Sequence, residues 1–266
     1  MSSVQGHADP SRRVMMALAN FNGRKLLFSW GLIAAYGMAL LGTAVFVASS
    51  LGKNDVSFVD DGWTVAVGFY IFAIFTMVAT NHAALRDRRE GTSEQHESLP
   101  ADPRIRAGGL ILATAWPLAA AAVLLSVVAA ATAVWLVVPS GIQLMALIQT
   151  AVLVATLGSL GVVLAAWVPN PFVAPVVAFA FFIVQTPEVP ASWHVIFPLA
   201  HLGSVYLAAW HTIYLVGLTL VFAGTALARS GARRSVIAFL LVGSAAVGIS
   251  LAVLITQVCS GSTCLF

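Results

Sequence analysis

Charged residues are scarce in this chain. Asp, Glu, Lys and Arg make up 9% of its 266 residues and hydrophobic residues make up 60%, whereas soluble proteins carry about 25% charged residues. The mean hydropathy of +0.95 and the length leave no room for a sizeable soluble domain. The net charge of +3 comes from basic residues in short loops beside apolar runs, so it does not indicate nucleic-acid binding. The composition predicts an all-α polytopic membrane protein.

The motifs of several functional classes are also missing. The sequence contains no Gly-x-x-x-x-Gly-Lys-Ser/Thr phosphate loop, and "LGKN" at 51–54 lacks the first glycine and the hydroxyl residue. No Asp, Glu, Lys or Arg lies well inside a predicted span, which disfavours ion-coupled transporters because they need buried ionisable groups. The spans offer no plausible catalytic constellation either. We therefore expect no enzyme activity in this chain, and any ATP hydrolysis must come from a separate polypeptide.

Cysteine is nearly absent. The two cysteines, Cys259 and Cys264, lie in "CSGSTCLF" at the end of the sequence. If this end is outside the cell, the flexible "SGST" would allow a disulfide between them. The sequence leaves the disulfide and two free thiols equally open.

The histidines are the remaining candidates for metal chemistry. His194 and His201 are seven residues apart, but only Glu188 lies near them as a third ligand. His82 and His211 lie at the expected ends of two spans, and nothing else in the sequence supports haem ligation by such a pair. We expect no metal site, and interpret the histidines as interfacial groups hydrogen-bonded to neighbours or water.

Long uncharged runs are the main feature that is present. A run of about 18 or more apolar residues can cross a bilayer as a helix. The third run is longer than a crossing needs, with Asp102 as the expected N-cap, Pro103 at the first helical position and a kink predicted by Pro117. Six to seven transmembrane helices are expected, and the predicted spans are 26–50, 62–84, 107–138, 141–168, 171–186, 211–228 and 235–257.

Basic residues are distributed unequally between the two sides of this topology. With a cytoplasmic N-terminus, twelve Lys and Arg residues fall on the cytoplasmic side and only Lys53 falls outside. This bias predicts a multi-pass protein of the plasma membrane with its C-terminus outside. No apolar core followed by a cleavage site is seen near the N-terminus, so we expect no cleaved signal peptide. Residues 1–25 are then a cytoplasmic, basic amphipathic segment, 26–257 the transmembrane domain and 258–266 an outer tail.

Residues 187–210 follow the short fifth run. A run that short suggests that the next residues supply a re-entrant or interfacial segment on the outer side, before the sixth span. Trp193, Tyr206, Trp210 and Tyr214 fit such an interface, where aromatic rings concentrate.

One polar segment, residues 85–106, interrupts the apolar runs. Thr92 followed by Gln95 forms a capping box, and Pro100 requires a helix to stop near Leu99. A short cytoplasmic helix is therefore expected between spans two and three. From the residues alone, a solvated loop that fixes topology and a docking element for a cytoplasmic partner are both open.

The string "RREGTSEQHESLPADPRIRAGG" in this segment resembles the first cytoplasmic loop of ABC-2 type transporter permeases. The resemblance extends to the basic N-terminal segment, the order of spans and the outer segment before span six. Gln95, His96 and a seventh span depart from the family's pattern. In that family the loop forms a coupling helix that contacts the ATPase, and the matching residues here are Arg88, Arg89, Glu90, Gly91, Thr92, Glu94, Leu99 and Pro100.

The resemblance implies the permease subunit of an ABC-2 exporter, moving a small or hydrophobic molecule. It implies three partners: a cytoplasmic ABC ATPase that carries ATP and Mg, a second permease copy or sister permease, and the lipid bilayer. The rival hypothesis is a non-transporting membrane anchor or sensor that docks a cytoplasmic partner through residues 85–106. Candidates for the substrate pathway, whose alternatives are to face lipid or to pack in the core, are Phe69, Phe72, Phe179 and Phe182.

Overall fold

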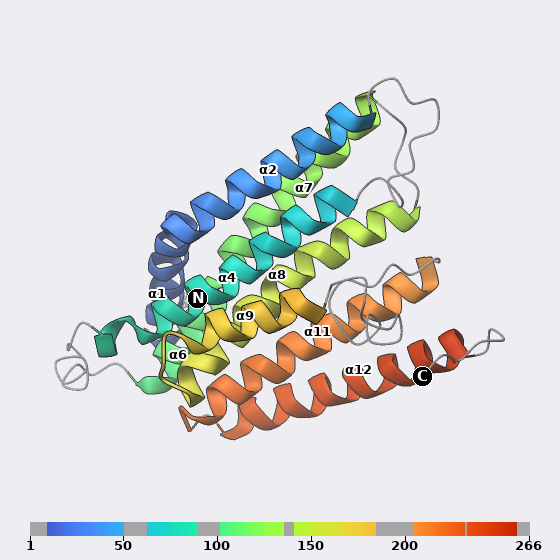
Figure 1. The fold of residues 1–266 in the computed structure, drawn as a ribbon. Helices are drawn as coiled ribbons and strands as arrows, with labels where there is room; N and C mark the ends of the chain where they lie inside the picture. The colour runs from blue at the N-terminus through green and yellow to red at the C-terminus, as the bar shows by residue number, and fades with distance from the viewer. Residues whose placement is uncertain are drawn as a thin grey trace, which may run out of the picture.

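The computed structural model of this protein describes most of the chain: residues 10–50, 63–89, 102–135, 141–184, 205–231 and 233–259. Every regular element in these ranges is an α-helix, and Figure 1 shows the helices packed along one another. Five described helical segments are long and apolar enough to cross a membrane, with α6 and most of α7 counted together as Pro103–Ala130, or six if the bent pair α1 and α2 is one span. The described residues therefore form an all-α fold, as predicted, with long apolar helices compatible with a polytopic membrane protein. The helices are α1 (Pro10–Leu27), α2 (Trp30–Ser50), α4 (Trp63–Arg89), α6 (Pro103–Ala113), α7 (Ala115–Trp135), α8 (Gly141–Trp167), α9 (Val173–Val184), α11 (Val205–Ala228) and α12 (Arg233–Cys259).

The first predicted span is divided between two helices. α1 ends at Leu27 and α2 begins at Trp30, with a bend of 58° between them. Ser29 stabilises the new start, because its hydroxyl oxygen accepts a hydrogen bond from the N–H of Leu32 at 3.5 Å, as an N-cap does. The long apolar helix therefore begins four residues later than the predicted position 26, and the basic segment forms a separate helix.

The third predicted span is interrupted, as its proline predicts, but at Thr114. Pro117 has no N–H to donate to the carbonyl of Ala113, so the helical hydrogen-bond ladder is broken there. The Thr114 hydroxyl and N–H both donate to the carbonyl of Ile111, at 2.6 and 3.1 Å, which tightens the turn between α6 and α7. The start of α6 follows the prediction, with Asp102 as N-cap and a proline at the first position.

The fifth and sixth runs differ from the predicted boundaries. α9 has 12 residues, fewer than the roughly 20 that a crossing helix needs. α11 begins at Val205, so Tyr206 and Trp210 lie within this helix rather than before it, and His211 lies inside the helix rather than at its start. The rest of the predicted re-entrant segment, residues 187–204, lies outside the described ranges.

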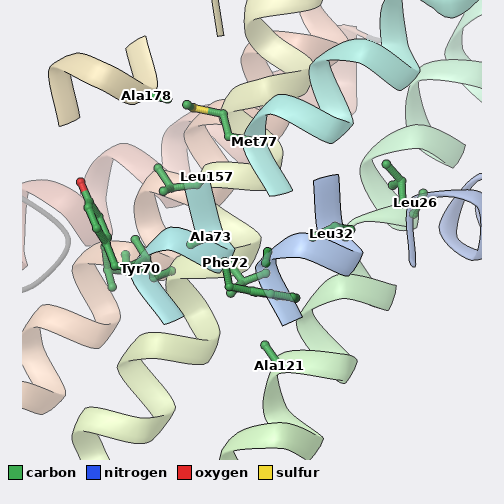
Figure 2. Close-up of a cluster of buried hydrophobic side chains, with 14 of the residues drawn as sticks. Leu26, Leu32, Tyr70, Phe72, Ala73, Met77, Ala121, Leu157 and Ala178 are labelled. Carbon is green, nitrogen blue, oxygen red and sulfur yellow. The ribbon is translucent and has the colours of Figure 1, made fainter. Parts of the chain in front are cut away.

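The bundle is built as a row of neighbours: α2 packs on α4, α4 on α8, α8 on α11, and α11 on α12. Glycines allow the backbones to approach: a Cβ at Gly161 of α8 would meet the carbonyl oxygen of Met77 in α4, and one at Gly243 of α12 would lie 2.8 Å from the carbonyl oxygen of Gly217. Small residues serve the same purpose in other membrane helix pairs. Figure 2 shows the buried apolar cluster between these helices, with Phe72 of α4 near Leu32 of α2.

Candidate functional site

The predicted coupling segment begins and ends in helices that belong to the bundle. Arg88 and Arg89 are the last two residues of α4. This helix therefore continues beyond residue 84, where the second span was predicted to end. On the other side, Oδ1 of Asp102 accepts a hydrogen bond from the N–H of Arg104 at 2.9 Å and caps α6. The remaining predicted coupling residues lie outside the described part of the chain: Glu90, Gly91, Thr92, Glu94, Leu99 and Pro100.

The basic helix α1 packs along α6, the helix that follows this segment. A Cβ at Gly109 would lie 3.0 Å from Cβ of Leu18 and 3.2 Å from the carbonyl oxygen of Met15, so the two backbones are in close approach. Gly23 of α1 lies against the indole of Trp116 in α7. Figure 1 shows α1 turned away from the line of α2 at the end of the bundle where α6 begins. α1 is therefore in direct contact with α6.

Polar side chains connect α4 to α8 inside the bundle. The Thr80 hydroxyl donates to the carbonyl of Gly158 at 2.9 Å, and Nδ2 of Asn81 donates to the carbonyl of Gly161 at 3.3 Å. Both side chains are fully buried. Oδ1 of Asn81, like the hydroxyl of Ser159, has no hydrogen-bond partner among the described residues.

A second set of polar contacts connects α8 to α11. The Thr156 hydroxyl lies 3.2 Å from the carbonyl oxygen of Leu215 and 2.9 Å from the Thr219 hydroxyl. About two helical turns before Thr156 in α8, Nε2 of Gln149 contacts Nδ1 of His211, and both side chains are buried. The buried polar groups of the described helices are uncharged or histidine, so this arrangement holds helices together and offers no carboxylate or lysine for acid–base chemistry.

His211 is hydrogen-bonded to a neighbour, as expected, but it is completely buried rather than interfacial. Sequence reasoning missed its partner because Gln149 lies 62 residues away, and the available signal was the recurrence of Thr, Gln and Ser in otherwise apolar runs. His82 is exposed on α4. Within the described ranges, no three His, Cys, Asp or Glu residues are placed to hold a metal ion.

The four phenylalanines suggested for a substrate pathway are not brought together. Phe69 and Phe72 of α4 are 1% and 0% exposed and pack in the core, whereas Phe179 and Phe182 of α9 are 66% and 51% exposed. Tyr70 connects the two helices, because its hydroxyl donates to the carbonyl of Phe181 at 2.9 Å. Phe69 and Phe72 thus pack in the core, one of the alternatives that the sequence left open, and the substrate pathway stays a prediction.

The predicted disulfide falls partly beyond the described residues. Cys259 is the last residue of α12, and Cys264 lies outside the described ranges. The bond therefore stays a prediction.

A cavity that sequence reasoning missed lies between α1, α6, α11 and α12. Its volume is about 770 Å³, and we call it the basic cavity because Arg12, Arg104 and Arg234 line it. The guanidinium Nη2 of Arg104 lies 3.8 Å from the position that a Cβ at Gly231 would take, so α6 reaches the turn between α11 and α12. The three arginines lie in separate parts of the sequence, and no local pattern indicates that they converge.

Comparisons with protein-family models, with curated proteins and with solved structures found no match to this chain. The resemblance to ABC-2 permeases therefore rests on the residues quoted above.

Proposed function

We propose that this chain is the transmembrane permease subunit of an ABC-2 type exporter, working with a separate cytoplasmic ATPase. The observation that supports this most is the packing of the basic helix α1 along α6, directly after the segment that resembles the coupling loop. In this proposal residues 85–106 contact the ATPase, which binds ATP and Mg. ATP hydrolysis is assigned to that ATPase, because this sequence has no phosphate loop.

The helix contacts suggest how movement would spread from that segment. A displacement at Pro103 shifts α6, whose continuation into α7 is weakened at Thr114 because the Pro117 ring removes one helical hydrogen bond. The same displacement moves α1, which continues through the 58° bend into α2. Two membrane helices would thus respond to one push from the cytoplasmic side.

The described spans support a proposal for the class of cargo. Their buried polar groups carry no carboxylate, lysine or arginine, and a charged cargo needs compensating groups along its path. We propose a small or hydrophobic molecule, moved outward between two permease copies or sister subunits. Phe179 and Phe182, exposed on α9, are the aromatic residues proposed for that interface.

The test compares two acidic residues of the polar segment. A partly buried charge left without its partner costs about 3 to 5 kcal/mol, whereas an exposed pair contributes about 1 kcal/mol or less. We therefore expect Glu90→Ala, at the position matching the family's acidic residue, to weaken co-purification of the ATPase and to reduce its transport-stimulated ATP hydrolysis. Glu97→Ala is the matched control and should have much less effect. Membrane insertion of both variants should equal that of the unchanged chain.

Two results would overturn the proposal. One is that no ATPase with a phosphate loop co-purifies with the full chain from its native membranes. The other is that both substitutions leave the complex and its ATP hydrolysis unchanged, which would return residues 85–106 to a solvated loop. Recovery of a cytoplasmic protein without a phosphate loop would favour the anchor or sensor function instead.

A further inference from the structure

The basic cavity concentrates positive charge from three helices. Arg12 is in the first turn of α1, Arg104 in the first turn of α6 and Arg234 in the first turn of α12. No acidic residue lines the cavity in the described part of the chain, and Asp102 directs its Oδ1 to the N–H of Arg104 as a helix cap. Three guanidinium groups without a lining carboxylate provide a site for an anion, and arginine matches phosphate oxygens well because its N–H groups form a planar fork.

One wall of the same cavity is apolar. Ile111 and Leu112 of α6, Leu227 of α11 and Phe239 of α12 form it. A soluble anion such as inorganic phosphate would occupy the arginine side and leave this wall exposed to water, which is unfavourable in proportion to the apolar area. A ligand with a phosphate at one end and hydrocarbon at the other fits both sides of the cavity.

The position of the cavity agrees with such a ligand. It lies beside the turn at Gly231, between the ends of two apolar helices that are long enough to cross the membrane. Apolar side chains next to it reach the outer surface of the bundle; Leu112 is 40% exposed. Basic pockets between membrane helices on the cytoplasmic side bind anionic lipid headgroups in other proteins.

We propose that the basic cavity binds one anionic phospholipid, with its phosphate on Arg12, Arg104 and Arg234 and its acyl chains along the apolar wall. The lipid would connect α1 and α6 to α11 and α12. This site is independent of the proposed transport function, because it needs neither an ATPase nor a cargo.

The test is lipid binding to the purified full chain in detergent, followed by native mass spectrometry. The probes are phosphatidylglycerol, phosphatidylcholine with the same acyl chains, and glycerol 3-phosphate as the soluble headgroup. We expect one phosphatidylglycerol to bind at least about tenfold more tightly than phosphatidylcholine, since each arginine near the headgroup contributes about fivefold. Glycerol 3-phosphate should bind much more weakly than the intact lipid.

Neighbouring arginines provide matched controls. Arg12→Gln should weaken phosphatidylglycerol binding about fivefold, whereas Arg13→Gln should change it less than about twofold, because Arg13 is on the same helix and exposed but does not line the cavity. Arg234→Gln and Arg229→Gln form a second such pair; Arg229 lies over the Trp167 ring, 5.8 Å from its centroid. Circular dichroism should show equal helix content for all variants. If Arg12→Gln does not fold, the comparison of Arg234→Gln with Arg229→Gln tests the proposal.

Three results would overturn the proposal. Equal binding of the two lipids would show that the arginines do not recognise the headgroup. Binding of glycerol 3-phosphate as tight as that of the lipid would indicate a soluble phosphate ligand. Equal losses for Arg12→Gln and Arg13→Gln would indicate diffuse surface charge rather than a site.

Discussion

At the residue scale, the spacing between helices is set by glycines that have no room for a side chain. Gly161 of α8 faces the carbonyl oxygen of Met77 and the hydroxyl of Thr80, both in α4. A methyl group there would meet backbone, which cannot rotate away as a flexible side chain can. By contrast, nothing lies within 4 Å of the position that a Cβ would take at Gly248 of α12.

These two glycines give a matched pair of substitutions. Gly161→Ala should lower the free energy of unfolding by about 3 kcal/mol, because overpacking a tight interface forces backbone shifts. Gly248→Ala should not lower it, and should raise it by up to about 1 kcal/mol because alanine favours a helix interior over glycine. Reversible unfolding in mixed micelles, followed by circular dichroism, measures both. Equal stability of the two variants would show that α4 and α8 are not in close approach at Gly161.

At the element scale, hydroxyl groups connect helices that apolar packing alone would leave free to slide. In lipid, burial of apolar surface gives little preference for one helix arrangement over another, so hydrogen bonds between helices and close packing decide it. Thr156 makes two such contacts across to α11, with the Leu215 carbonyl and the Thr219 hydroxyl. Thr256 of α12 is exposed, and the two contacts that its hydroxyl makes are with Ala252 and Val253 of its own helix.

Thr156→Val should therefore cost more than Thr256→Val. Valine keeps the shape and removes the hydroxyl, and a hydrogen bond between membrane helices contributes about 0.6 to 2 kcal/mol. We expect a loss of about 1 kcal/mol for Thr156→Val in the same unfolding measurement, and no measurable change for Thr256→Val. The opposite order would show that α8 and α11 are not held together by this contact.

The elements themselves could be predicted from the sequence to a large extent. A chain in lipid must satisfy its backbone hydrogen bonds internally, so each long apolar run predicts a helix, and Asp102 with Pro103 predicts where α6 begins. Boundaries that depend on tertiary contacts were less predictable. The bend at Ser29 and the early start of α11 at Val205 have no equally clear signal in the hydropathy of the sequence.

At the scale of the whole molecule, contacts between distant segments could not be predicted from the sequence. Gln149 and His211 were each visible as polar residues in or beside apolar runs, but their pairing depends on the rotation of two helices about their axes. The basic cavity depends in the same way on where α1 is placed after its bend. The orientation in the membrane, by contrast, is a prediction of charge alone.

The membrane orientation can be tested at the last two helices. α11 and α12 pack together and are joined by a short turn that includes Gly231, whose φ of 81° favours glycine, so they run in opposite directions. Arg229, Arg233 and Arg234 lie at this turn, and the positive-inside rule places it in the cytoplasm.

A reporter enzyme that is active only outside the cell should therefore be active when fused after Phe266 and inactive when fused after Ala228. Activity only after Ala228 would reverse the proposed topology, and an inactive reporter at both positions would show that α12 does not cross the membrane. Substituting Glu for these three arginines should lower the activity of the Phe266 fusion, because the turn would lose the charges that retain it inside.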